Sequence, residues 1–242
     1  MKAQENKFVN YSVIRYDSKL NVFEADNKFT SIECAVKIYL NDEFLTAVYC
    51  SPNDLEDLIV GILAQRDLIN NFDEVLKLDV DKENFIVNVT TSKSSSVKTN
   101  RQVEDIHFNA KLILSCADKL LSELSKTHEI TNGVHSGVIF DGQNILAFRE
   151  DVGRHNVFDK LYGWSLRNNI SLVDKVLIFS GRCSSEMMTK LDRMGIRVVA
   201  AKSVPTTLSI NIAKKLGVTL IARMAPNSFC IYTNPQRILI NT

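Results

Sequence analysis

Apolar residues in the second half of the chain stand in short runs, and the stretches between these runs have helical spacing. The predicted strands are 135–140, 144–148, 175–179, 197–201 and 218–222. The predicted helices are 155–168, 184–194 and 206–216, and the segments 229–233 and 237–240 are expected as short edge strands. Alternation of short strands and helices is typical of an α/β domain with helices on both faces of a sheet.

The first ninety residues have a different pattern. The first thirty are polar and mixed, which predicts one or two strands at a sheet edge. The stretch "CAVKIYLNDEFLTAVYC" (34–50) alternates and predicts a hairpin that turns at Asn41 and Asp42. Ser51, Pro52 and Asp54 then match the N-cap, first and third positions of a helix start. With "VLKLDV" and "NFIVNVT" as further strands, residues 1–90 are predicted to form a small α+β domain.

A composition break separates the two halves. The stretch "TTSKSSSVKTNRQVED" (90–105) is rich in Ser, Thr and Lys, and a linker or mobile surface loop is predicted over residues 91–106. A helix is predicted at about 108–127, with apolar residues along one side. The second domain is therefore expected to span residues 107–242.

Composition excludes several classes of protein. Of the 242 residues, 45% are hydrophobic and 24% charged, with a formal net charge of +1. This is an ordinary globular balance that gives no global attraction to nucleic acid or anionic lipid. No apolar run approaches the roughly 18 residues of a membrane span, and the N-terminus lacks the apolar core of a signal peptide. A cytoplasmic protein without membrane or nucleic-acid partners is expected. The five cysteines lie far apart, which predicts free thiols and no metal site.

Polar clusters follow four of the predicted strands in the second half. They begin at Arg149, Ser180, Lys202 and Arg223, in "REDVGRHN", "SGRCSSE", "KSVPTT" and "RMAPNS". Ligands of open α/β sheets bind beyond the carboxyl ends of the strands, where helix N-termini offer unpaired N–H groups. Guanidinium and hydroxyl groups there suit phosphate or pyrophosphate. Carboxylates suit ribose, a base or a ring N–H, so the clusters predict a site for a nucleotide-like ligand.

Each cluster also has a purely structural interpretation. Ser184 is a natural helix N-cap and Pro205 a natural helix starter. A lone histidine such as His155 is more often a helix-start residue than a catalytic base. Cys183 stands at a helix N-terminus, which stabilises a thiolate, but it also suits a small buried position.

Other enzyme classes match the sequence less well. The order of elements suits the nucleoside deaminase fold, yet the H-x-E and P-C-x-x-C zinc signature is replaced by His135-Ser136-Gly137 and "GRCSS". No G-x-G-x-x-G follows a strand, which argues against a dinucleotide-binding oxidoreductase. There is no nucleophile elbow of a hydrolase, and no basic face with an aromatic platform for nucleic acid.

Several blocks together resemble the formate dehydrogenase accessory proteins of the FdhD/NarQ family. They are "NDEFLTAVYCSPNDLEDLIVGILAQRDLI", "NGVHSGVIFD", "FREDVGRHNVFDKLYGW", "SGRCSSEMMTKL", "KSVPTTLSINIAKKLGVTLIARM" and "IYTNPQRI". They cover about residues 34–240 in order, and the E-D-V-G-R-H-N-x-x-D-K run is specific to that family. The resemblance implies a three-layer αβα sandwich similar to the cytidine deaminase fold without its zinc, next to the smaller N-terminal domain.

The resemblance also implies a function in molybdenum cofactor maturation. Family members are sulfurtransferases that take a persulfide from a cysteine desulfurase and pass sulfur to bis-(molybdopterin guanine dinucleotide), which formate dehydrogenase or another molybdenum or tungsten enzyme needs; GDP mimics part of this cofactor. A homodimer is expected, because the cofactor carries two pterin nucleotides. The residues predicted to bind the cofactor are His135, Glu150, Asp151, Arg154, His155, Asn156, Lys160, Ser180, Arg182, Ser203, Thr206 and the run Arg223, Met224, Ala225, Pro226, Asn227 and Ser228.

The chain departs from the family at the sulfur carrier. The family carries a C-x-x-C motif in the loop before the "GVH" strand, and the corresponding "TTSKSSSVKTNRQ" contains no cysteine. Serine cannot hold a persulfide, so no catalytic residue is assigned, and Cys183 and Cys116 are only weak candidates. Two hypotheses remain: a sulfurtransferase with a non-standard cysteine or an external carrier, and a non-catalytic chaperone that binds the cofactor.

Overall fold

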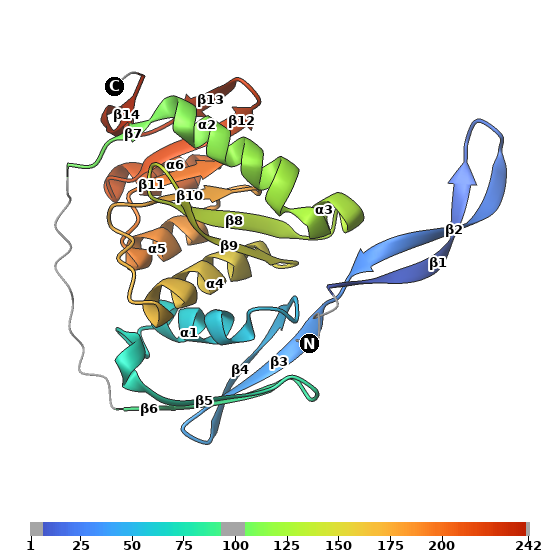
Figure 1. The fold of residues 1–242 in the computed structure, drawn as a ribbon, viewed down its shortest axis with the longest axis horizontal. Coiled ribbons are helices and arrows are strands. Elements are labelled where there is room, and N and C mark those ends of the chain that lie inside the picture. Colours follow the sequence, from blue (N-terminus) through green and yellow to red (C-terminus); the bar gives the residue numbers. More distant parts are fainter. Residues whose placement is uncertain (1–6, 93–104, 241–242) are drawn as a thin grey trace.

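The computed structural model describes residues 7–92 and 105–240, and its largest element is a six-stranded mixed sheet (Figure 1). The order of its strands is β13-β12-β11-β10-β8-β9. Their bounds are β8 His135–Phe140, β9 Ile145–Asp151, β10 Val176–Phe179, β11 Val198–Ala201, β12 Thr219–Ala225 and β13 Ser228–Ile231. The helices that follow these strands are α4 Arg154–Arg167, α5 Ser185–Met194 and α6 Thr207–Lys215, so the three helices expected in this half are confirmed.

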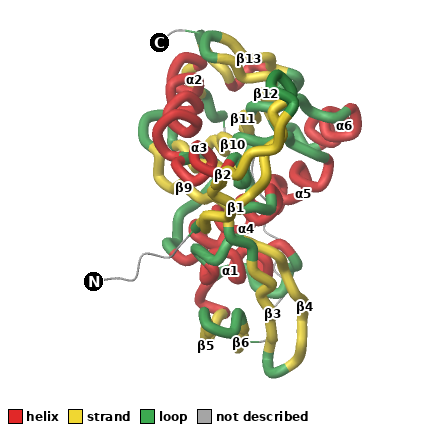
Figure 2. Tube along the Cα trace, turned by 90° about the vertical axis from the view of Figure 1, so that its right-hand side faces the viewer, coloured by secondary structure: helices red, strands yellow, loops and turns green. Residues whose placement is uncertain are grey.

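Side chains of the sheet alternate between two apolar layers. On one face Val138, Ile178 and Val198 pack with the buried side of α2 (Ala110–Lys119). On the other face Ile139, Phe179 and others pack with α4 and α5. Figure 2 shows α2 on one side of the sheet and α5 and α6 on the other. The expected α/β sandwich with helices on both faces is confirmed, while its likeness to the cytidine deaminase fold stays a prediction.

A second, four-stranded sheet forms below the first in Figure 1. Its order is β4-β3-β6-β5, and its strands are β3 Cys34–Leu40, β4 Glu43–Cys50, β5 Val75–Asp81 and β6 Ile86–Thr91. The expected turn at Asn41 and Asp42 is confirmed, with φ of 50° and 68° as a two-residue hairpin turn requires. A 3₁₀ turn at Phe72–Glu74 precedes β5.

The one or two strands expected in the first thirty residues are confirmed, but their expected place at the edge of a larger sheet is wrong. Among the described residues, β1 (Phe8–Asp17) and β2 (Val22–Ser31) pair only with each other, as a separate two-stranded sheet that extends away from the body (Figure 1). Their ten cross-strand pairs run in regular register from Phe8 opposite Ser31 to Asp17 opposite Val22.

The predicted start of the helix after β4 is also wrong. α1 spans Leu55–Gln65, and Asp54, in the left-handed region, precedes it without a side-chain cap. Ser51 bonds elsewhere: its N–H donates to Asp151 Oδ2 at 3.1 Å, and its hydroxyl accepts from the Val152 N–H at 3.1 Å. The Ser51 hydroxyl therefore forms a tertiary hydrogen bond and does not cap α1.

The single helix expected at about 108–127 is broken into several elements. β7 (Phe108–Asn109) pairs with β14 (Ile238–Leu239), and α2 then begins behind the Asn109 cap. A π-helical turn (Leu120–Leu124) and α3 (Lys126–Thr131) follow. The break falls at Ser125, whose buried hydroxyl lies 2.5 Å from that of Ser136 on β8. The predicted loop 91–106 lies largely outside the described residues.

α1 and α4 join the two parts of the molecule. The helices approach so closely that a Cβ on Gly61 would lie 1.8 Å from the Asp159 carbonyl oxygen, and one on Gly163 equally close to that of Asp57. The buried Asp57 carboxylate accepts from Arg149 Nε at 2.8 Å and from Arg167 Nη1 at 2.5 Å. One buried apolar cluster includes residues of β3, α1, α4 and the six-stranded sheet. No helix within the described ranges is long and apolar enough to cross a membrane.

Candidate functional site

The carboxyl ends of four strands lie on one edge of the six-stranded sheet. β8 is antiparallel to both β9 and β10, so β9 and β10 run in the same direction, and β11 and β12 are parallel to β10. We call the margin formed by the ends of β9, β10, β11 and β12 the strand-end edge. The four strands therefore end on one edge of the sheet, and whether the polar clusters there share one site stays a prediction.

Backbone hydrogen bonds connect the clusters along this edge. The Lys202 N–H donates to the Phe179 carbonyl at 2.9 Å, and the Ser203 N–H donates to the Gly181 carbonyl at 3.4 Å. The Arg223 N–H in turn donates to the Ser203 carbonyl at 3.3 Å. The segments around Ser180, Ser203 and Arg223 are therefore neighbours.

A cavity of about 260 Å³ opens at the strand-end edge. Three of its lining side chains, His135, Ser180 and Lys202, come from the predicted clusters or the start of β8. The remainder of the lining is Leu121, His128, Asn132, Gly133 and Val134. We call it the histidine cavity. The cavity occupies only part of the strand-end edge. Its lining does not include Arg154, Arg182, Ser203 or Arg223.

The two histidines of this cavity differ in their surroundings. His128 Nδ1 lies 2.9 Å from the Val134 carbonyl oxygen, which can only accept, so Nδ1 carries the hydrogen. Burial, followed by the charges of Arg154 and His128, lowers the pKa of His135, which favours its neutral form. A Cβ on Gly181 would lie 3.0 Å from His135 Nδ1 and 2.7 Å from the Phe179 ring, so this place requires a glycine.

Exposed cationic groups follow the strands that end on this edge, and one of them, Lys202, lines the cavity. Arg154, Arg182 and Lys202 are exposed, and within residues 7–92 and 105–240 their side chains have no hydrogen-bond or ion-pair partner. Arg223, at φ 55° in the irregular pairing of β12 with β13, donates from Nε to the Tyr232 hydroxyl at 3.0 Å. Guanidinium and ammonium groups without internal carboxylates are free to bind an anion.

The opening cluster "REDVGRHN" is placed differently from the expectation. Arg149, Glu150 and Asp151 do not follow β9 but belong to it, because they pair with Gly137, Ser136 and His135 of β8. Asp151 and Lys160 have no exposed side-chain surface and lie 2.7 Å apart. Asp151 also accepts from the Gly153 N–H and from Asn156 Nδ2, both at 2.8 Å. In this conformation Asp151 and Lys160 cannot contact a ligand. Their buried ion pair stabilises the strand-end edge from the interior.

Glu150 is buried beside α3. Its Oε1 accepts from the Thr127 hydroxyl at 2.6 Å and from Lys7 Nζ at 2.9 Å. Its Oε2 is buried and has no hydrogen-bond partner among the described residues. A cofactor contact through Glu150 stays a prediction, and the unpaired oxygen is compatible with it.

The other predicted ligand residues are spread around the edge. Asn156 is buried and donates to the Tyr49 carbonyl at 2.8 Å, and His155 Nδ1 lies 3.5 Å from Glu186 Oε2. The Thr206 hydroxyl accepts from the Ser209 N–H and caps α6. Met224 is nearly buried, while the turn Ala225, Pro226, Asn227 and Ser228 between β12 and β13 is exposed. His128 was missed, because it belongs to no recognised motif and the helix was expected to end just before it.

Four of the five cysteines are buried and only Cys230 is exposed. Burial raises the pKa of Cys116 to about 12 and also raises the pKa of Cys183. Cys34 and Cys50 lie opposite each other on β3 and β4 with their sulfurs 3.8 Å apart. A hydrogen bond from the Cys50 thiol lowers the pKa of Cys34, and the same bond raises that of Cys50. Burial thus keeps Cys116 and Cys183 as protonated thiols at neutral pH.

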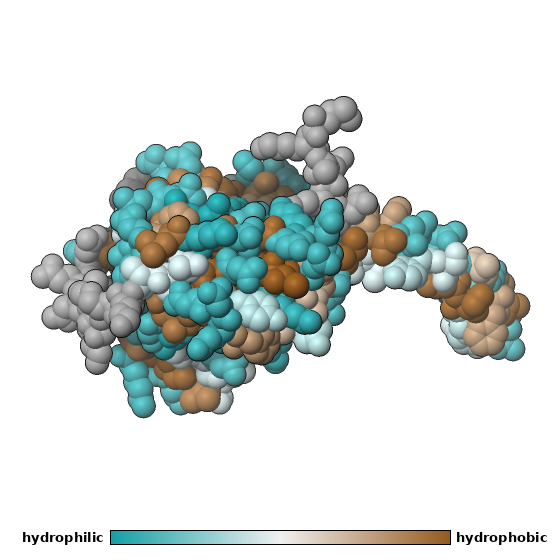
Figure 3. Space-filling view, turned by 90° about the horizontal axis from the view of Figure 1, so that it is seen from below, coloured by the Kyte–Doolittle hydropathy of each residue, from teal (hydrophilic) through white to brown (hydrophobic). Residues whose placement is uncertain are grey.

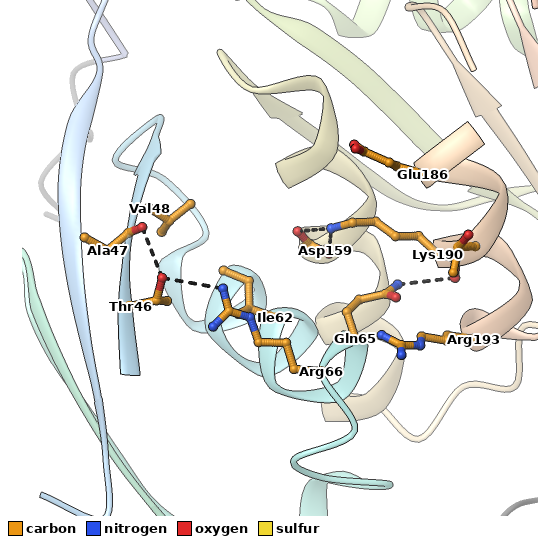
Figure 4. A pocket seen from close by; sticks show the side chains of 11 residues that line it. Thr46, Ala47, Val48, Ile62, Gln65, Arg66, Asp159, Glu186, Lys190 and Arg193 are labelled. Atoms are coloured by element: carbon orange, nitrogen blue, oxygen red, sulfur yellow. Dashed lines mark hydrogen bonds and ion pairs between the residues drawn. The ribbon is translucent and has the colours of Figure 1, made fainter. Parts of the chain in front are cut away.

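A second cavity, of about 390 Å³, lies between β4, α1, α4 and α5 (Figure 4). Its polar side chains bond with one another. Lys190 Nζ lies 2.5 Å from Asp159 Oδ2, Gln65 Nε2 donates to the Lys190 carbonyl at 3.3 Å, and Arg66 Nη2 donates to the Thr46 hydroxyl at 3.5 Å. Burial raises the pKa of Asp159, against the opposing effect of Lys190. These bonds join α1 and α4 to α5.

Comparisons with known proteins give one consistent result. The model of the FdhD/NarQ family matches residues 31–103 and 88–239. A sulfur carrier protein FdhD from Staphylococcus haemolyticus is 33% identical over 253 residues, which covers 94% of this chain and 95% of the relative. One from Staphylococcus aureus is 32% identical with the same coverage. A crystal structure described as a formate dehydrogenase accessory protein from Desulfotalea psychrophila superimposes with a TM-score of 0.86 at 24% identity, over 97% of this chain and 100% of that one.

Proposed function

The chain belongs to the FdhD/NarQ family of formate dehydrogenase accessory proteins, and from that premise we propose that it binds bis-(molybdopterin guanine dinucleotide) at the strand-end edge. In this proposal it assists the transfer of sulfur from a cysteine desulfurase to the bound cofactor. The client is formate dehydrogenase or another molybdenum or tungsten apo-enzyme.

The observation that carries the proposal is the row of cationic groups along one edge. Arg154, Arg182 and Lys202 are exposed, and none has a partner within the described part of the chain. A guanine dinucleotide presents a pyrophosphate, and each charge-assisted hydrogen bond to it is worth about 1.5–3 kcal/mol. The donor set therefore fits the phosphate part of the cofactor.

The histidine cavity fits a smaller part of the ligand. Its volume of about 260 Å³ is below the roughly 300–1,000 Å³ of sites that enclose a drug-sized molecule. We propose that it receives one ring system while the phosphates lie outside on the cationic groups. His128, His135 and Ser180 offer donors and acceptors to that ring.

The role of the protein's own residues in sulfur transfer is limited. The bound cofactor supplies the metal centre that receives sulfur, and the chain's residues hold and orient it. The stretch that matches the family's carrier loop contains no cysteine, and four of the five thiols are buried. These two observations favour a second candidate, a cofactor chaperone that binds without carrying sulfur.

Incubation with a cysteine desulfurase and cysteine separates the two candidates. A persulfide mass shift on any cysteine, Cys230 being the only exposed one, would identify a sulfurtransferase. Absence of the shift, with cofactor binding retained, would leave the chaperone.

Binding itself is tested with GDP. We expect GDP to raise the melting temperature of the protein, because a ligand that binds only the folded state stabilises it. Guanosine, which lacks the phosphates, is expected to produce a much smaller shift. Equal shifts from the two ligands would contradict a phosphate-based site. We further propose that the protein is a homodimer, since the cofactor carries two pterin nucleotides.

A further inference from the structure

β4 is an outer strand of the four-stranded sheet. Within residues 7–92 and 105–240 it pairs on one side only, with β3. The open edge of a strand presents a row of N–H and C=O groups to which another chain can pair, and proteins usually protect such an edge with proline, charge or a covering element. β4 contains no proline and, after Glu43, no charged residue. Its outer edge is therefore able to accept a further strand.

The open side of β4 faces the cavity of about 390 Å³ between β4, α1, α4 and α5, here called the β4 groove (Figure 4). Thr46, Ala47 and Val48 line this groove. The Tyr49 carbonyl points away from β3, because it accepts from Asn156 Nδ2 of α4 at 2.8 Å. Outward-pointing residues alternate along a strand of an antiparallel pair, so Ala47 also directs its N–H and C=O away from β3. These are the two groups that an added strand would bond.

α5 forms the opposite wall of the β4 groove. It contributes Glu186, Thr189, Lys190 and Arg193, which are spaced three and four residues apart and share one face of the helix. At 1.5 Å per residue this wall is about 10 Å long, which matches about three residues of an extended chain. A peptide that adds a strand to an open edge gains affinity from main-chain hydrogen bonds and specificity from its side chains.

The floor of the β4 groove contains an unsatisfied acceptor. Gln65 is 5% exposed, and its Nε2 donates to the Lys190 carbonyl at 3.3 Å, which fixes the orientation of the amide. Its Oε1 is buried and has no hydrogen-bond partner among the described residues. Buried acceptors are normally paired, so a bound molecule with a donor at this point would be stabilised. Val48 and Ile62 add apolar lining to the same groove.

Arg66 is the cation of the β4 groove that is open to a carboxylate. Lys190 already pairs with Asp159, and Arg193 pairs with Asp67 at an exposed site. Arg66 is exposed, and in the described part of the chain its guanidinium has only a hydroxyl of β4, at 3.5 Å, as hydrogen-bond partner. A carboxylate on the bound strand would form a charge-assisted hydrogen bond with it.

The outer face of the sheet is a less suitable docking surface than its edge. Figure 3 shows the molecule from below, from the side of the four-stranded sheet, and hydrophilic and hydrophobic residues are mixed over that view. Docking onto a face depends on a contiguous apolar patch. Pairing along β4 depends on backbone groups instead.

We propose that an extended segment of a partner protein, carrying an acidic side chain, adds to β4 as a further strand in the β4 groove. Its backbone bonds the Ala47 N–H and carbonyl, and its carboxylate pairs with Arg66. Figure 4 shows Glu186 at the opposite end of the groove from Arg66 and Arg193, so the acid lies at the arginine end. The site differs from the strand-end edge, and the proposal does not depend on cofactor binding.

The first test is selection of displayed random peptides of about eight residues against the full chain. Selected peptides are synthesised, and their affinity is measured by fluorescence polarisation. The proposal predicts alternating apolar residues with one acidic position in common, and protection of the Ala47 amide from hydrogen exchange when the peptide binds. A selection without binders, binders without the common acid, or an unprotected Ala47 amide would overturn it.

Variants test the backbone and the charge separately. Ala47→Pro removes the N–H, and the fold should persist because proline is tolerated on an edge strand whose N–H faces outward, as the melting temperature checks. We expect Ala47→Pro and Arg66→Glu each to weaken peptide binding at least about tenfold. A peptide with lysine in place of its acid should regain affinity for Arg66→Glu. Lys77→Glu, on the other outer strand of the sheet, is the control and should bind like wild type.

Unchanged affinity in Arg66→Glu, no recovery with the lysine peptide, or an equal loss in Lys77→Glu would overturn the proposal. Light scattering distinguishes a partner segment from a second copy of the chain on the same edge. The proposal predicts the same molar mass for wild type and Ala47→Pro. A lower mass for Ala47→Pro would assign the edge to a second copy and overturn the proposal.

Discussion

Lys160 Nζ lies 2.7 Å from Asp151 Oδ2 in the interior, and neither side chain has any exposed surface. Lys160 also donates to the Glu150 carbonyl at 3.1 Å, and the Ser51 N–H donates to Asp151. This ion pair binds α4, the end of β9 and the segment before α1 to one another. Asp151, nine positions before Lys160 in the sequence, thus belongs to a buried network that stabilises the strand-end edge.

Removal of one partner of this pair should be costly. We expect Lys160→Met to lower the free energy of unfolding by about 3–5 kcal/mol, because Asp151 is left as an uncompensated buried charge. The measurement is urea unfolding followed by circular dichroism. Arg193→Met is the control, since Arg193 pairs with Asp67 at an exposed site and such a pair contributes about 0–1 kcal/mol. Similar losses in both variants would contradict the account.

The close approach of α1 and α4 predicts an unusual response to alanine. In an exposed helix, Gly→Ala stabilises by up to about 1 kcal/mol. At Gly61 the added Cβ would lie 1.8 Å from the Asp159 carbonyl oxygen, so the helices must separate. We therefore expect Gly61→Ala to lower the melting temperature strongly, as measured by calorimetry. A variant as stable as wild type would show that the two helices do not pack through this glycine.

The prediction for His135 concerns pH. Burial, then Arg154 and His128, lowers its pKa in the folded protein, whereas in the unfolded chain it stays near about 6.5. Between these two values the unfolded state binds a proton that the folded state does not, so stability falls as the pH drops through this window. His135→Gln should lose less stability than wild type on acidification, measured by urea unfolding. The control is His107→Gln, at an exposed side chain, and an acid loss in His135→Gln equal to that of wild type would contradict the prediction.

The cysteines should differ sharply in reactivity. Cys230 is exposed, whereas Cys34, Cys50, Cys116 and Cys183 are buried. We expect native protein treated with iodoacetamide near neutral pH to gain one adduct rapidly, at Cys230, as located by mass spectrometry. The same reaction in urea should modify all five. Rapid native modification of Cys116 or Cys183 would show that the raised pKa and burial of these thiols do not protect them.

Much of the fold could be predicted because it depends on local patterns. The alternation of apolar strands with helices predicted the second half, and the rule that ligands bind at strand carboxyl ends predicted the strand-end edge. The turn at Asn41 and Asp42 was equally local, because both residues tolerate the left-handed region.

The predictions were wrong where contacts between residues far apart in the sequence determine the local structure. Ser51 looked like an N-cap, but Asp151 and Val152, about a hundred residues away, take its hydrogen bonds. The expected long helix breaks at Ser125, which bonds Ser136 of β8. Asp151 and Lys160 looked like solvated site residues, since charges are rarely fully buried unless paired, and their pairing is visible only in three dimensions.

The most direct test of the account is calorimetric titration of GDP into wild type, Arg154→Ala and Arg182→Ala. Both arginines are exposed at the strand-end edge, and Lys214→Ala, an exposed cation near the end of α6, is the control. The account predicts that each arginine variant loses about 1–3 kcal/mol of binding free energy, and that Lys214→Ala binds like wild type. Unchanged affinity in both arginine variants would contradict a phosphate site at this edge.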